Sequence, residues 1–202
     1  MIKGVIFDLD GTLFEADYDW PAIKRRLGLP NPDGSIMDYL RSLPEGERAQ
    51  KERLLEEIED RATREGRLIS GAAELLQFLH ERGLITALVT NNRQRNVRRI
   101  LERYGLHFDL VLTRESGLTK PSGAPLLLAA QRLHLEPGDL AAVGDNEFDL
   151  RAAREAGLGL IIIVNPDVER FKGRCDYAVR DLEELKVLFG RLLQQRREEV
   201  GG

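Results

Sequence analysis

The chain has 202 residues, of which 42% are hydrophobic, and its formal net charge is −4. This length allows one substantial core, and the acidic balance argues against a protein that binds a nucleic-acid backbone. The longest nearly pure apolar stretch, residues 158–164, is far too short for a membrane helix, and the N-terminus does not resemble a secretory signal. We therefore expect a cytoplasmic protein with no membrane or nucleic-acid partner. Cys175 is the single cysteine, which excludes an intramolecular disulfide.

The chain opens with "IKGVIFDLD", in which Val5, Ile6 and Phe7 follow one another without polar alternation. Such a run is typical of a strand that is buried on both faces. Similar short runs occur at 84–90, 108–113, 140–145 and 158–164, and amphipathic helical patterns over 72–83, 96–105, 123–135 and 147–157 alternate with them. This alternation predicts an α/β fold, with a parallel sheet covered by helices on both faces.

Residues 15–70 interrupt this rhythm and contain no convincing strand. They read as three helices separated by the turns "PNPDGS" and "PEGE", and the third helix is long and highly charged, with Leu54, Leu55 and Ile58 as its apolar stripe. We therefore predict a small all-helical cap at 15–70, inserted after the first strand of a core formed by 1–14 and 71–202.

Polar residues collect where the predicted strands end. Asp8 and Asp10 end the first apolar run, Thr90 with Asn91 and Asn92 ends the second, and Gly144 with Asp145 ends the run at 140–145. In an open parallel sheet the carboxyl ends of the strands open into one crevice, where ligands bind. We therefore expect these distant residues to meet at one edge of the sheet.

Each motif also has an ordinary structural interpretation. A second Asp-x-Asp pair, Asp17 and Asp19, has no strand before it and suggests only capping or solvation, so the spacing alone is uninformative. The "TNN" at 90–92 could be a helix N-cap, "GDNEFD" at 144–149 could be an acidic first helical turn, and Lys120 could be a surface lysine.

The combination is harder to explain structurally. Asp8, Asp10, Asp145 and Asp149 would place up to four negative charges in one crevice, which is costly unless a cation is present. Mg²⁺ prefers oxygen ligands, and Thr90 and Lys120 suit the oxygens of a phosphoryl group.

The order Asp-x-Asp-Gly-Thr, Thr, Lys and Gly-Asp-x-x-x-Asp resembles the haloacid dehalogenase superfamily over nearly the whole chain. It resembles specifically the phosphatases with a helical cap, similar to phosphoglycolate phosphatase, and this implies a Rossmann-like core. By this resemblance Asp8 is the nucleophile and Asp10 the general acid and base. Thr90, Asn91 and Lys120 bind the phosphoryl group, and Mg²⁺ is held by Asp8, Asp10 through its carbonyl, Asp145 and Asp149.

Two positions depart from the pattern of the family. In "KPSGAP" the second proline comes later than the usual Pro-x-Pro, and Asn146 stands where a small hydroxyl residue is frequent. The first departure concerns the loop around Lys120, and the second concerns the support of the metal site. Within the cap, Arg25, Arg26 and Tyr39 are candidate contacts to the leaving group.

The resemblance therefore implies a small-molecule phosphate ester as substrate, with phosphoglycolate as the first compound to test, and a monomer or homodimer. A phosphomutase of the same superfamily would keep the same residues. A receiver-like signalling domain or a non-catalytic phospho-ligand binding module is the alternative from another class. Dehalogenases of the superfamily need neither Mg²⁺ nor the second acid, which favours a phosphate substrate.

Overall fold

The computed structural model describes residues 2–201, and the side chains of residues 2–194. Six parallel strands form one sheet in the order β5-β4-β1-β6-β7-β8. Their bounds are β1 Gly4–Phe7, β4 Ile85–Val89, β5 Leu110–Leu112, β6 Leu140–Gly144, β7 Leu160–Val164 and β8 Tyr177–Val179. The predicted parallel α/β sheet is confirmed, and it gains β8, whose three residues are too few to show a periodic pattern.

Strand β1 lies at the centre of the sheet, which explains its continuous apolar run. Phe7 pairs with Leu88 of β4 on one side and with Val143 of β6 on the other. Val5 and Phe7 belong to the hydrophobic cluster on one face of the sheet, and Ile6 belongs to the cluster on the opposite face. Because successive side chains point to opposite faces, a central strand covered on both faces must be apolar throughout.

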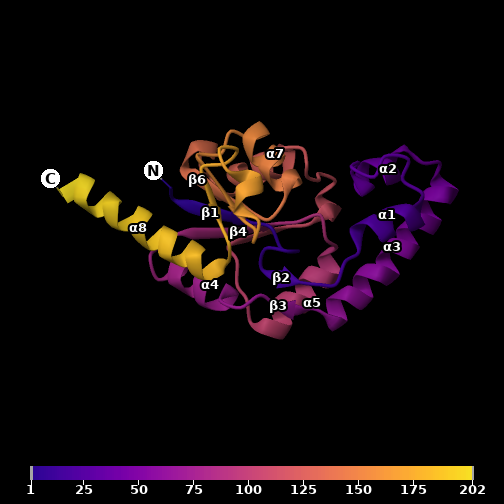
Figure 1. Cartoon of the computed structure of the whole chain (residues 1–202), viewed down its shortest axis with the longest axis horizontal. Coiled ribbons are helices and arrows are strands. Elements are labelled where there is room, and N and C mark those ends of the chain that lie inside the picture. Colours follow the sequence, from indigo (N-terminus) through magenta and orange to yellow (C-terminus); the bar gives the residue numbers. More distant parts are fainter. Residues whose placement is uncertain (1, 202) are drawn as a thin grey trace.

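Helices cover both faces of the sheet, as predicted (Figure 1). The helices α4 (Ala72–His80), α5 (Gln94–Tyr104) and α8 (Leu182–Gly201) contribute to one hydrophobic cluster. The helices α6 (Ala124–Leu133) and α7 (Glu147–Glu155) contribute to the other. The sheet is therefore held between two packed helical layers.

Three further helices lie to one side of the sheet (Figure 1): α1 (Trp20–Leu27), α2 (Ile36–Ser42) and α3 (Glu45–Glu65). They bury a separate small cluster of Ile23, Leu27, Ile36, Leu40 and Leu55. The Asp19 side chain accepts a hydrogen bond from Ala22 N at 2.9 Å and caps α1. This is the capping role expected of an acid at the start of a helix.

The expectation of no strand within 15–70 is wrong at the two ends of that segment. Strand β2 (Phe14–Glu15) pairs antiparallel with β3 (Arg67–Leu68), so the two chain crossings between the three helices and the sheet are joined. The pair escapes sequence reasoning because two residues carry no period and the partner lies about fifty positions away. Phe14 anchors the ribbon, since its buried ring lies 6.3 Å from the ring of Tyr104.

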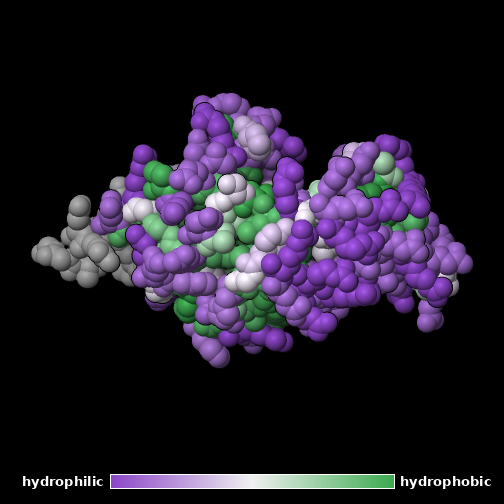
Figure 2. All heavy atoms as spheres, turned by 90° about the horizontal axis from the view of Figure 1, so that it is seen from below, coloured by the Kyte–Doolittle hydropathy of each residue, from purple (hydrophilic) through white to green (hydrophobic). Residues whose placement is uncertain are grey.

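The surface differs between the two parts of the molecule. The face in Figure 2 is mostly hydrophilic over the three-helix part, whereas hydrophobic side chains gather over the part that carries the sheet. Among the described residues, no helix combines the length and apolar character needed to cross a membrane.

Candidate active site

The carboxyl ends of three neighbouring strands bring the predicted acids together. Asp8 follows β1, Thr90 follows β4 and Asp145 follows β6, and β1 lies between the other two strands. Asp149 in the first turn of α7 joins them. Asp8, Asp145 and Asp149 each offer an oxygen atom, and these three atoms lie within 4.8 Å of one another.

A tight turn after β1 folds Asp10 back toward the site. The carbonyl of Leu9 accepts hydrogen bonds from the main-chain N–H groups of Thr12, Leu13 and Phe14. Gly11 in this turn has a φ of +84°, and a Cβ at this position would collide with the Asp145 carboxylate. Glycine is therefore required here both for the backbone conformation and for the close approach of the β6 loop.

Lys120 bridges two of the acids from the loop before α6. Its Nζ lies 2.6 Å from Asp8 Oδ1 and 2.6 Å from Asp149 Oδ1, and the residue is only 5% exposed. Burial by itself would lower the pKa of Lys120, but the charges of Asp149 and Asp8 outweigh it and raise that pKa. Lys120 therefore stays protonated and offsets part of the negative charge in the site.

The single positive charge of Lys120 does not balance the negative charges of the clustered acids. Burial raises the pKa of Asp8 to about 6, against the opposing effect of Lys120. Burial, followed by the charges of Asp149 and Asp8, raises the pKa of Asp145 to about 8. Mg²⁺ prefers several oxygen ligands, and its positive charge would favour the ionised forms of these carboxyl groups. The residues therefore fit Mg²⁺.

Asn146 and Asp149 form a capping box at the start of α7. Asp149 Oδ2 accepts the main-chain N–H groups of Asp145 and Asn146 at 3.2 and 3.3 Å. Asn146 Nδ2 donates to Asp145 Oδ1 at 2.7 Å. The departure from the family pattern at Asn146 therefore supplies a direct hydrogen bond to Asp145, a candidate metal ligand.

The Asp10 carboxyl has no ion pair among the described residues, unlike the carboxylates of Asp8 and Asp149, which both pair with Lys120. Its Oδ2 accepts a hydrogen bond from Asn92 Nδ2 at 2.9 Å, whereas its buried Oδ1 has no hydrogen-bond partner in residues 2–194. Burial, followed by the Asp8 charge, raises the pKa of Asp10 to about 7. A carboxyl with such a pKa can exist in both protonation states near neutral pH.

The "TNN" stretch is not the N-cap of the following helix. Helix α5 begins at Gln94 after Arg93, which makes no side-chain capping bond. Asn91 instead reaches Lys120: its Nδ2 donates to the Lys120 carbonyl at 2.8 Å, and its Oδ1 accepts from Lys120 N at 2.9 Å. The buried Thr90 hydroxyl accepts the N–H of Asn92 at 3.0 Å.

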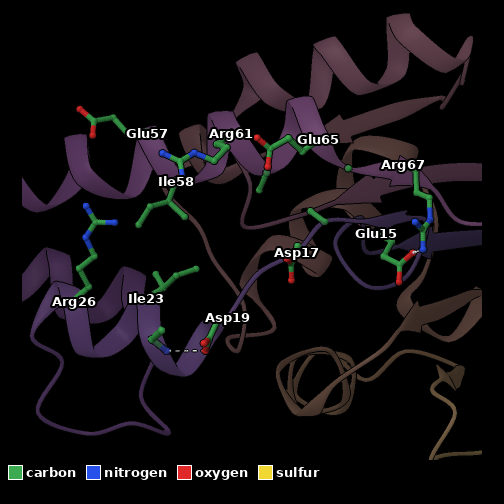
Figure 3. A pocket seen from close by; sticks show the side chains of 14 residues that line it. Glu15, Asp17, Asp19, Ile23, Arg26, Glu57, Ile58, Arg61, Glu65 and Arg67 are labelled. Carbon is green, nitrogen blue, oxygen red and sulfur yellow. Dashed lines mark hydrogen bonds and ion pairs between the residues drawn. The ribbon is translucent and has the colours of Figure 1, made fainter.

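Among the described residues, no ion pair joins the three predicted substrate contacts to the clustered acids. Arg25 is exposed on α1, and the Tyr39 ring faces Lys51 Nζ, 5.5 Å from the ring centroid, inside the three-helix part. Arg26 lines a separate cavity of about 710 Å³ between α1, α3 and the segment that precedes α1. Figure 3 shows Arg26 and Arg61 lining this cavity from the two helices, and none of the clustered acids borders it.

Two other basic residues of these helices do contact the core. Arg41 Nη2 donates to Thr119 Oγ1 at 3.0 Å, directly before Lys120. Lys24 Nζ lies 6.0 Å from the centroid of the Phe148 ring, directly before Asp149. Sequence reasoning missed both residues, because the helical pattern does not reveal which face of a short helix meets the loops and helices of the core.

A buried ion pair also joins α3 to the core. Arg114 Nη1 and Nη2 lie 2.7 and 2.9 Å from the two carboxylate oxygens of Glu59, which is 4% exposed. Burial raises the pKa of Glu59, against the opposing effect of Arg114. The pair lies close enough to the site for the Glu59 charge to contribute to the raised pKa of Asp10.

Comparison with known proteins identifies the family. The model of haloacid dehalogenase-like hydrolases matches residues 2–157. The chain is similar to an uncharacterized hydrolase of Saccharomyces cerevisiae, with 29% identity over 91% of this chain and 89% of the relative. It is also similar to phosphoglycolate phosphatase of Chromobacterium violaceum, with 30% identity over 91% of this chain and 95% of that protein. The crystal structure of a phosphatase from Thermococcus onnurineus superposes with a TM-score of 0.69 at 25% identity, covering 94% of this chain and 98% of the other. The chain therefore belongs to the haloacid dehalogenase-like hydrolase family, as its motifs predict.

Proposed function

We propose that this chain is a Mg²⁺-dependent phosphomonoester hydrolase that acts through an aspartyl phosphate on Asp8. The observation that carries the proposal is the unequal setting of two carboxyl groups. Asp8 Oδ1 lies 2.6 Å from Lys120 Nζ, whereas Asp10 Oδ1 is buried without a hydrogen-bond partner in residues 2–194. A paired carboxylate suits a nucleophile, and an unpaired carboxyl group with a raised pKa suits proton transfer.

In the first step the ionised Asp8 carboxylate attacks the phosphorus atom. The bond between phosphorus and the leaving oxygen breaks, and Asp10 gives its proton to that oxygen, so the alcohol leaves neutral. In the second step water attacks the phosphorus of the aspartyl phosphate, and the bond to Asp8 breaks. Asp10 takes the proton of the water, which regenerates both carboxyl groups in their starting states.

The remaining site residues bind the phosphoryl group and the cation. We assign Thr90, the main chain of Asn91 and Lys120 to the phosphoryl oxygens. Asp8, the Asp10 carbonyl and Asp145 would hold Mg²⁺, with Asp149 as a further ligand or support. When bound there, Mg²⁺ supplies positive charge that offsets the repulsion between the Asp8 carboxylate and the phosphoryl group.

The substrate in this proposal is a small phosphorylated metabolite, and phosphoglycolate is the first to test. The name of the Chromobacterium violaceum relative supports this choice. We propose that residues 15–70 act as a cap that selects the leaving group and excludes water from a core of residues 1–14 and 71–202. The enzyme would work in the cytoplasm as a monomer or homodimer.

A phosphate-release screen tests the proposal. The panel contains phosphoglycolate, sugar phosphates and nucleoside monophosphates, each with and without Mg²⁺. We expect phosphate release that requires Mg²⁺. When the phosphoryl group of the substrate is labelled, rapid quenching in acid should also trap a labelled protein. Asp8→Asn should lose both. No release from any compound with Mg²⁺ present would count heavily against a general metabolic phosphatase. Dependence on a bisphosphate activator with little free phosphate would instead indicate a phosphomutase, and full activity of Asp8→Asn would exclude an aspartyl phosphate on Asp8.

A further inference from the structure

Asn92 is buried next to the site, and each of its polar groups has a partner. It is 4% exposed. Its main-chain N–H donates to Thr90 Oγ1 at 3.0 Å, and its carbonyl accepts the Arg114 N–H at 3.3 Å. Its side-chain Oδ1 accepts the Arg93 N–H at 2.7 Å, and Nδ2 donates to Asp10 Oδ2 at 2.9 Å. Asn92 therefore connects a candidate phosphate-binding residue to the candidate acid.

The local network fixes which end of the amide faces Asp10. A main-chain N–H can only donate, so the atom that meets the Arg93 N–H must be the amide oxygen. The NH₂ group then points to Asp10 and can only donate. A reversed amide would set its NH₂ against the Arg93 N–H, so that two donors face each other and the hydrogen bond is lost.

This single donor makes the two oxygens of Asp10 unequal. Oδ2 is engaged as an acceptor, while Oδ1 is buried without a partner in residues 2–194. We propose that Asn92 is a positioning residue for Asp10: its amide fixes Oδ2 and leaves Oδ1 as the oxygen available for proton transfer. The inference rests on the proposed function of Asp10 as general acid and base.

A purely local role for Asn92 does not account for this geometry. To fix the backbone just before α5, Asn92 needs only its Oδ1 as an acceptor for Arg93 N–H. The bond from Nδ2 spans 82 positions of sequence and ends on a carboxyl group. A structural asparagine in the same region offers the comparison, because Asn96 on α5 is fully buried and contacts no acid of the site among the described hydrogen bonds.

The test uses two esters that differ in their need for an acid. An alkyl phosphate such as phosphoglycolate has a poor leaving group that requires protonation, whereas p-nitrophenyl phosphate releases a stable anion. Because kcat/KM includes only the steps through release of the first product, it isolates the donation of the proton. The variants are Asn92→Ala and Asn92→Ser, which lack a donor that reaches Asp10, and Asn96→Ala serves as the matched buried control.

We expect kcat/KM for the alkyl ester to fall about 10- to 100-fold in both Asn92 variants, which is part of the total contribution of a general acid. For the aryl ester kcat/KM should fall by less than about 3-fold. Asn96→Ala should lower kcat/KM for the two esters by equal factors. Equal losses on both esters in the Asn92 variants would refute the positioning role. If one variant fails to fold, as judged by circular dichroism, the other decides.

A second measurement does not need turnover. The side-chain amide protons of Asn92 should exchange slowly with solvent in the wild-type protein and at least 10-fold faster in Asp10→Ala, because the hydrogen bond is lost. A chain inactive on the whole phosphate-ester panel would contradict the proposed hydrolase, while the exchange result would still report on the Asn92–Asp10 bond. Exchange that is unchanged by Asp10→Ala would refute the positioning role whatever the activity.

Discussion

Asn91 and Lys120 are joined by two reciprocal hydrogen bonds, of 2.8 and 2.9 Å, between the Asn91 amide and the Lys120 main chain. The pair connects the loop after β4 to the loop before α6, which have no strand pairing with each other in the described sheet. Lys120 Nζ in turn reaches Asp8 at 2.6 Å. The position of the lysine charge therefore depends on an asparagine that sequence reasoning assigned to the phosphate.

Removing the Asn91 amide should displace Lys120 and slow turnover. We expect Asn91→Ala to lower kcat by about 10- to 100-fold, since small errors in the placement of catalytic groups have effects of this size. Asn91→Asp keeps the oxygen that accepts Lys120 N–H, but it loses the donor to the Lys120 carbonyl and adds a negative charge, so it should not restore activity. The measurement is steady-state kinetics on the best substrate of the phosphate-release screen. If Asn91→Ala raised KM and left kcat unchanged, the side chain would bind substrate instead of positioning Lys120.

The raised pKa of Asp145 predicts how stability depends on pH without metal. A carboxyl group whose folded-state pKa is raised to about 8 contributes stability that is complete below its ordinary pKa of 3.8 and is lost as pH rises through 8. Asp145→Asn cannot ionise and should be more stable than the wild type at about pH 9, by roughly 2 kcal/mol, or about 4–8 °C in Tm. This difference should shrink toward about pH 4.

Thermal unfolding across this pH range, with and without Mg²⁺, checks the prediction. Mg²⁺ should raise the Tm of the wild type more than that of Asp145→Asn, because binding to the folded state alone is stabilising. Glu147→Gln is a control of opposite sign: its hydrogen bond with Arg174 lowers the pKa of Glu147, so this variant should be less stable than the wild type at neutral pH. A wild type that stayed more stable than Asp145→Asn at high pH without metal would contradict the prediction.

Much of the fold could be predicted because the sheet leaves a strong signal. A central strand such as Gly4–Phe7 is apolar on both faces, and its last residue is followed at once by Asp8. The β2–β3 pair and β8 have two or three residues each, so no periodic pattern marks them. Their pairing is decided by tertiary contacts.

The residues of the candidate site also fall into those that the sequence predicts and those that it does not. Asp8 and Asp145 were predictable because each ends a strand, and strand ends meet at one edge. The sequence placed Asn92 at this edge but did not predict its contact with Asp10, and it did not single out Glu59. The contact of Asn92 with Asp10 depends on the path of two loops, and Glu59 lies in a helix so rich in charges that nothing in the sequence separates the buried acid from the exposed ones.

The Glu59–Arg114 pair should stabilise the docking of α3 on the core. Removing one partner leaves a buried charge without compensation, so Glu59→Gln should lower the free energy of unfolding by about 3 kcal/mol. The double variant Glu59→Leu with Arg114→Met should be less destabilised than the sum of the effects of Glu59→Leu alone and Arg114→Met alone. Urea unfolding of the four proteins of this cycle gives the coupling energy.

An exposed pair in the same helix serves as the control. Glu47 and Lys51 lie 3.5 Å apart with both side chains partly exposed, and Glu47→Gln should change stability by less than about 0.5 kcal/mol. If Glu59→Gln had an effect as small as that of Glu47→Gln, the buried pair would not hold α3 to the core.

The contacts between the three helices and the core predict which basic residues select the substrate. Lys24 and Arg41 each meet a residue directly before a site residue, Phe148 before Asp149 and Thr119 before Lys120. A hydrogen bond to a charged group is worth about 1.5–3 kcal/mol, so Lys24→Ala and Arg41→Ala should raise KM for an acidic substrate such as phosphoglycolate by about 10-fold or more. KM for p-nitrophenyl phosphate, whose leaving group has no carboxylate, should change by less than about 3-fold.

The matched controls are Arg25→Ala, Arg26→Ala and Tyr39→Phe, which alter the residues that the sequence proposed. None of the three is placed against the core by the described contacts, so each should change KM for phosphoglycolate by less than about 2-fold, the effect usual for a surface change. A larger effect of Arg25→Ala or Arg26→Ala than of Arg41→Ala would restore the original assignment. Equal effects of Lys24→Ala on both esters would mean that Lys24 holds the helices against Phe148 and does not discriminate between leaving groups. A residue that only positions these helices affects every substrate alike.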